Sequence, residues 1–175
     1  MKGINKKYIV GVSVTAICIL CFIIYFTYGD KSKIIDRELE KIYSLPQNYS
    51  IEQAVKDGMV DVSKVLEKEN KNINKFLLKV NQKGWAVLKT VEDSEEEPVI
   101  TMYVFDDRID EIRTWKYTVT KQGGQSPDRR FKSYYTTDNN EISTVYLVNI
   151  KNSQRPNSDS EILKDEPLYS YKKSN

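Results

Sequence analysis

The sequence contains no histidine, and its only two cysteines are Cys18 and Cys21. Without histidine, the chain cannot assemble the serine–histidine or cysteine–histidine nucleophile systems, which use imidazole as the base. Zinc sites built from histidine and cysteine are excluded beyond residue 29 for the same reason. Calcium sites with oxygen ligands, carboxylate-pair chemistry and lysine-based chemistry stay open. No motif commits a residue to catalysis, to a metal or to a cofactor, and we predict none.

Charged residues are also absent from the 21 positions between Tyr8 and Tyr28. At about 1.5 Å per residue, a helix of this length covers roughly 30 Å, the thickness of a bilayer's hydrocarbon core. Lys2, Lys6 and Lys7 precede the run, and positive charge favours the cytoplasmic side. We therefore predict a cytoplasmic N-terminus over residues 1–7 and a transmembrane signal anchor over residues 8–28. Tyr8 and Tyr28 mark its two interfacial ends.

This run has two alternative interpretations. A cleaved secretion signal has a shorter apolar region and small residues before the cut, and Thr27 with Gly29 is a poor cleavage pair. A lipid-attachment signal has a small residue before the modified cysteine, but Ile17 and Leu20 hold those positions. We expect an uncleaved anchor, with cleavage as the stronger of the two alternatives.

The segment after the anchor lacks an excess of either charge. Residues 30–175 contain all 25 acidic residues and 24 of the 27 basic ones, because three lysines precede the anchor, so their net charge is −1. A nucleic-acid partner normally requires a concentrated basic face, so none is predicted. The segment has no cysteine to form a disulfide, and its core must stabilise it alone. Its length suits one small domain.

Three helices are expected at the start of this segment. Residues 29–48 predict a helical stalk or linker, in which Ile35, Leu39 and Ile42 share one face. In "YSIEQAVKDG", a capping box of Ser50 and Gln53 predicts a helix over residues 51–57, closed by a left-handed glycine at position 58.

The third helix is expected in "NKNINKFLLKVNQKG". Its apolar residues repeat at intervals of three and four, which makes a single stripe. Asn70 or Asn72 is placed to cap its start, and Gly84 follows its end.

After Gly84 the apolar period changes from 3.6 to 2, which predicts strands. "WAVLKTVE" places Ala86, Leu88 and Thr90 on one face, and "VITMYVF" is β-branched and aromatic. Further strands are expected around residues 115–120 and in a hairpin that turns at residues 138–140. We predict an α+β domain over residues 49–150, in which two or three short helices pack on one mostly antiparallel sheet of four or five strands. Residues 151–175 are polar and predict a disordered tail.

Two loops raise the possibility of ligand binding. "EDSEEEP" clusters acids between two strands, but it lacks the glycine and the alternating spacing of a calcium loop, so we favour a solvated hairpin. "KQGGQSPDRR" places Arg129 and Arg130 after a glycine pair, and it is either a plain connection or a loop that binds an acidic ligand. Tyr134 belongs to a run of strand tyrosines that serve either the core or an aromatic binding surface. These three residues are the candidate ligand contacts.

The segments "YSIEQAVKDGMVDV", "NINKFLLKVNQKG" and "EEPVITMYVFDDRI" together resemble a bacterial family catalogued only as a domain of unknown function, number 4362. The resemblance covers about residues 49–149. It implies a small secreted or membrane-attached protein of Gram-positive bacteria, and it implies no activity. The matching positions are Ser50, Glu52, Ala54, Gly58, Asn72, Phe76 and Pro98.

We predict a single-pass protein of the cell membrane, with a cytoplasmic N-terminus and a non-catalytic extracytoplasmic domain. The domain would bind a protein or a polymer of the cell envelope. One alternative is an accessory subunit of a larger membrane complex. Another is an envelope hydrolase that uses two carboxylates held about 5–10 Å apart. Its candidate acids are Asp106, Asp107, Asp110 and Glu111.

Overall fold

The computed structural model describes residue 17 and residues 31–94, 97–119, 129–139, 141–149 and 165–173. The chain divides into two compact units, Met1–Ser44 and Leu45–Asn175. In the first unit, residues 31–43 form a helix, as the stalk pattern predicts, and Lys41 pairs with Glu38 one turn earlier at 2.7 Å. No helix among the described residues has the length and apolarity needed to cross a membrane. The predicted anchor lies outside the described residues except for Ile17.

The second unit begins with a short capped helix. Helix α2 spans Ile51–Lys56, and its capping box is formed as predicted. Gln53 donates its backbone N–H to the Ser50 hydroxyl at 3.3 Å, and the Ser50 N–H donates to the Gln53 side chain at 2.9 Å. Gly58 follows with a φ of 87°, the left-handed conformation expected there. The chain then enters the two-residue strand β1 (Val60–Asp61).

Helix α3 spans Lys71–Asn81 and buries its apolar stripe, which consists of Ile73, Phe76, Leu77 and Val80. Asn70 caps the helix by accepting the N–H groups of residues 72 and 73 at 2.9 and 3.3 Å. The left-handed residue after the helix is Lys83, with a φ of 54°, and not Gly84. Gly84 instead donates its N–H to the carbonyl of Lys79 at 2.9 Å, so the chain turns one residue earlier than the glycine suggests.

Five strands form a mixed sheet in the order β1-β2-β3-β4-β5. Strand β2 spans Ala86–Ser94, β3 spans Glu97–Asp106, β4 spans Glu111–Thr118 and β5 spans Arg129–Phe131. Neighbours from β2 to β5 are antiparallel, and β1 joins β2 in parallel at Thr90 and Val91 only. Strands β2 and β3 pair as the hairpin interpretation of the acidic cluster predicts, with Ser94 opposite Glu97, and residues 95 and 96 lie outside the described residues.

Three strands form a second antiparallel sheet in the order β6-β7-β8. Strand β6 spans Ser133–Asn139, β7 spans Ile142–Val148 and β8 spans Glu166–Lys172. The expectation of one sheet is therefore wrong, although the α+β class and the β6–β7 hairpin are confirmed. The expected disorder of residues 151–175 is also wrong for residues 166–172, because Leu168 and Tyr169 of β8 are buried in the core. Residues 150–164 lie outside the described residues.

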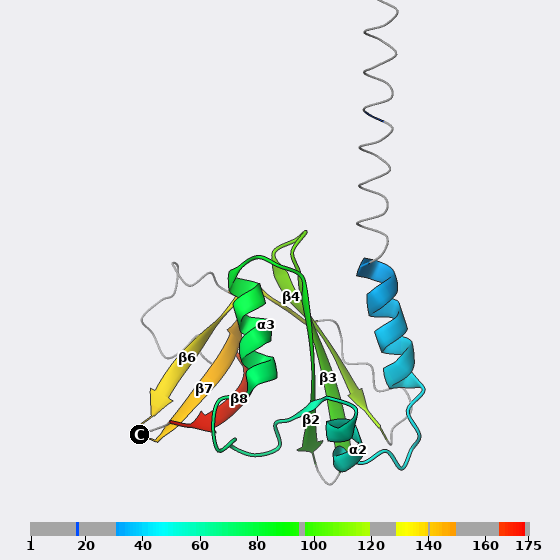
Figure 1. Ribbon diagram of the computed structural model, residues 1–175, viewed down its shortest axis with the longest axis horizontal. Helices are drawn as coiled ribbons and strands as arrows, with labels where there is room; N and C mark the ends of the chain where they lie inside the picture. The colour runs from blue at the N-terminus through cyan, green and yellow to red at the C-terminus, as the bar shows by residue number, and fades with distance from the viewer. Residues whose placement is uncertain are drawn as a thin grey trace, which may run out of the picture. The chain divides into compact units, whose positions relative to one another are not determined.

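One hydrophobic core joins α3 to both sheets. Helix α3 runs beside β2 and in front of the second sheet (Figure 1). Leu88 and Phe105 enter the core from the first sheet, and Leu147 and Leu168 enter it from the second. The Tyr169 hydroxyl donates to the Asn74 side chain of α3 at 3.2 Å. Because α3 covers only part of the first sheet's inner face, the polar remainder of that face forms a pocket beside β8.

Candidate functional site

The pocket has a volume of about 230 Å³ and lies between strands β2 to β4 of the first sheet and the start of β8. Its position follows from the strand registers, since Thr90 is paired with Thr101, and Tyr103 with Thr114, on the face that also bears Leu88. Its lining residues are Val62, Thr90, Glu92, Thr101, Tyr103, Thr114, Lys116, Arg129, Glu166, Pro167 and Leu168. The pocket is smaller than typical drug-binding cavities, so it suits one small chemical group.

Two ion pairs flank the pocket. Lys116 Nζ lies 2.6 Å from Glu92 Oε1, and Arg129 Nη1 lies 3.0 Å from Glu166 Oε2. The basic partners are largely exposed, so each pair contributes at most about 1 kcal/mol to stability and can exchange partners at little cost. Their charges balance, and the pocket therefore favours a ligand without net charge that both donates and accepts hydrogen bonds.

Buried hydroxyl groups form the interior of the pocket. Thr90, Thr101 and Thr114 are each less than 5% exposed, and so is Tyr103. Burial raises the pKa of the Tyr103 hydroxyl, and the nearby charges of Glu166 and Glu92 raise it further. Tyr103 therefore stays protonated at neutral pH and serves as a hydrogen-bonding group, not as a base. The Thr114 hydroxyl donates to the Arg129 carbonyl at 3.5 Å, which connects the interior to the arginine.

Only one of the three candidate ligand contacts lies at this pocket. Arg129 lines it, whereas the adjacent Arg130 points to Glu111, with 3.8 Å between Nη1 and Oε2. Tyr134 packs against the core, and its hydroxyl accepts a hydrogen bond from Asn81 at 2.5 Å. The alternation of a strand explains the separation, because successive side chains point to opposite faces. The predicted anchor ends, Tyr8 and Tyr28, lie outside the described residues.

The acids of the hydrolase alternative lie in and beside the turn between β3 and β4, and none lines the pocket. Asp106 is 2% exposed and is bound by Arg108 at 2.5 and 2.6 Å. The hydrogen bonds from Arg108 hold the pKa of this carboxyl below its ordinary value. Asp110 pairs with Lys83, and Glu111 with Lys132. These contacts give the acids structural partners. Within the described ranges, no group of three or more acidic side chains could hold a metal ion.

Sequence reasoning missed most of the pocket. The alternation of β2 did place Thr90 on the inner face with Ala86 and Leu88, so a polar residue at a core position was a usable signal. The polar composition of residues 151–175 predicts a disordered tail that includes Glu166, and nothing local in the sequence indicates its pairing with Arg129.

Comparisons with models of known families, with curated proteins and with solved structures found no match to this chain.

Proposed function

We propose that the chain is a single-pass membrane protein that displays a non-catalytic binding domain on the extracytoplasmic side of the cell envelope. The membrane assignment is supported by the uncharged run over residues 8–28 and by the lysines before it. It also agrees with the resemblance to secreted or membrane-attached bacterial proteins of unknown function. In this proposal, the helix over residues 31–43 belongs to the stalk between the anchor and the domain.

The observation that carries the binding role is the pocket of buried hydroxyls between two balanced ion pairs. Its lining residues donate and accept hydrogen bonds but include neither imidazole nor thiol. Tyr103 remains protonated, and both acidic lining residues are held by cations. Such a lining can recognise a polar group through hydrogen bonds. We propose that the ligand is a neutral, hydroxyl-rich unit of an envelope polysaccharide.

The test compares two neighbouring arginines. The full chain, purified in detergent micelles, is titrated calorimetrically with soluble fragments of cell-wall glycan. Arg129→Ala should weaken binding at least about tenfold, because a hydrogen bond from a charged group contributes roughly 1.5–3 kcal/mol. Arg130→Ala removes the same charge outside the pocket and should leave the affinity unchanged.

The pocket proposal would be rejected if the unaltered chain showed no saturable binding to these fragments, or if both arginine variants weakened it equally. Thr114→Val provides a second check that keeps the charge and removes only a buried hydroxyl. It should also weaken binding, since the hydroxyl both lines the pocket and contacts the Arg129 carbonyl.

A further inference from the structure

The five-stranded sheet has an open edge along the first residues of β2. Strand β1 pairs with β2 only at Thr90 and Val91, and no other strand among the described residues pairs with β2 on that side. The Val62 N–H donates to the Val91 carbonyl at 2.9 Å, so the polar backbone groups of Val91 point to this edge. Backbone direction alternates along a strand, which directs the N–H and C=O of Val87 to the same edge. An unpaired edge of this kind is a template for another strand.

A groove of about 320 Å³ follows this edge. Helix α3 runs beside β2 in the opposite direction and forms the other wall (Figure 1). Trp85 and Val87 are partly exposed there, whereas Phe76 and Leu88 lie beneath the groove in the core. Gly58, just before β1, lies at the groove as well. An added strand would therefore lie in line with β1. The groove is lined by Gly58, Asn72, Lys75, Phe76, Lys79, Trp85, Ala86, Val87, Leu88 and Lys89.

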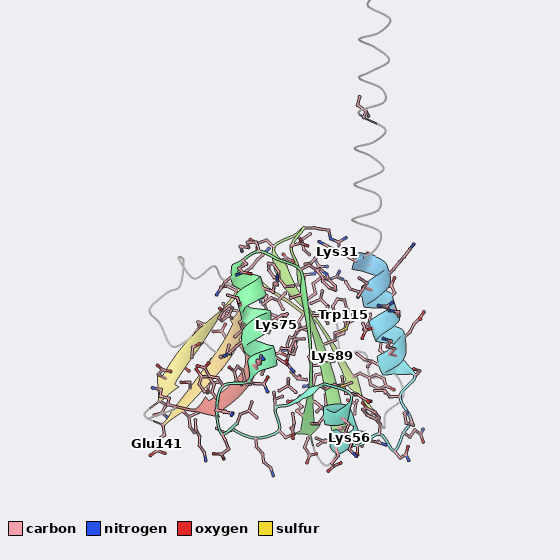
Figure 2. The ribbon with its side chains drawn as sticks, in the orientation of Figure 1. Lys31, Lys56, Lys75, Lys89, Trp115 and Glu141 are labelled. Atoms are coloured by element: carbon pink, nitrogen blue, oxygen red, sulfur yellow. The ribbon has the colours of Figure 1, made fainter. Side chains whose placement is uncertain are left out.

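The charged side chains that line the groove are all lysines. Lys75 and Lys79 come from successive turns of α3 and Lys89 comes from β2, while no acidic residue lines the groove. Lys75 and Lys89 are labelled on these two elements in Figure 2.

From the open edge and the lysines beside it, we infer that this groove binds an extended acidic segment of another protein, which adds a strand to β2. Backbone hydrogen bonds to the edge would supply affinity, and Lys75 and Lys79 would select carboxylates on the segment. At roughly 3.3 Å per residue, about four residues would pair along Ala86–Lys89. The site is separate from the hydroxyl-lined pocket, and the inference does not depend on that pocket's ligand.

The test uses the full chain in detergent micelles and an acetylated, amidated peptide of about six residues that alternates glutamate with valine and threonine. A matched peptide carries N-methyl groups on the edge-facing amides, and another has lysine in place of glutamate. At about 0.15 M ionic strength the acidic peptide should bind saturably, and both matched peptides should bind at least about tenfold more weakly. The amide of Val87 should exchange with solvent more slowly when the acidic peptide is bound.

Charge reversal tests the same site from the protein side. The double variant Lys75→Glu with Lys79→Glu should weaken binding of the acidic peptide about tenfold or more and should strengthen binding of the lysine peptide. The variant Lys68→Glu with Lys71→Glu has the same net charge outside the groove and should behave like the unaltered chain. Equal binding of the N-methylated peptide would overturn the inference, since it would show attraction by charge without strand addition. Pairing of two copies of the chain through this edge would overturn it as well.

Discussion

At the residue scale, the carboxylate of Asp106 is a buried charge held by a specific partner. It is 2% exposed, and Arg108 binds both of its oxygens. Asp106→Asn should lower the free energy of unfolding by about 1–3 kcal/mol at pH 7, because it replaces the charged acceptor of the Arg108 hydrogen bonds with a neutral amide. Urea unfolding measures this loss. Asp93→Asn, at an exposed position, should change stability by less than about 0.5 kcal/mol.

The pair of Asp106 and Arg108 also predicts how the stability lost in Asp106→Asn depends on pH. The pKa of Asp106 lies below its ordinary value of 3.8, chiefly because of the hydrogen bonds from Arg108. A carboxylate with a lowered pKa stabilises the fold above the pKa that it has in the unfolded chain, and this contribution is lost as the pH falls through the lowered value. The unaltered chain and Asp106→Asn should therefore differ at pH 7 and converge in stability below pH 3.8. A difference that stays constant across this window would contradict the account.

At the scale of elements, the two glycines that follow helices should respond oppositely to alanine. Gly58 has a φ of 87°, so Gly58→Ala should destabilise the domain by about 1–2 kcal/mol. This cost is conformational, because an added Cβ would meet no atom within 4 Å. Gly84 lies outside the left-handed region, and its added Cβ would make an ordinary contact with Lys79 at 3.4 Å. Gly84→Ala should be neutral or slightly stabilising in thermal melts. Equal losses in both variants would rule out the conformational explanation.

Strand β8 gives a second prediction at this scale. Leu168 is 2% exposed within the core, so Leu168→Ala should cost about 2–5 kcal/mol. Ile142→Ala removes an apolar side chain that is 36% exposed in the neighbouring strand and should cost clearly less. Chemical unfolding of the two variants would measure the difference. An unchanged stability for Leu168→Ala would mean that residues 166–172 lie outside the core.

The elements also show which features the sequence could predict. Helices α2 and α3 were predictable because their signals are local, as in the capping box of Ser50 and Gln53 and the apolar stripe of α3. Strand β8 was not, because "EPLYSYK" has few apolar residues and gains its partners from β7. The candidate pocket was missed for the same reason, since Glu166 meets Arg129 across 37 positions of sequence. Pairing between distant segments leaves little trace in a single sequence.

At the scale of the whole molecule, the proposed anchor and the proposed binding sites depend on different levels of structure. The proposed anchor follows from composition alone, because 21 uncharged residues need no partner in order to enter a membrane. The proposed binding sites instead require the folded domain, since each is built from segments that are distant in sequence. In this proposal, attachment lies in the first 28 residues and recognition lies in the unit Leu45–Asn175.

The most direct test of this division is protease accessibility in intact bacterial cells that produce the full chain with a C-terminal epitope. The account predicts that added protease removes the epitope without prior permeabilisation and leaves a membrane-bound N-terminal fragment, while a cytoplasmic marker protein stays intact. An epitope that survives until the cells are permeabilised would contradict the proposed orientation. Release of the undigested chain into the medium with its first 29 residues missing would contradict the anchor.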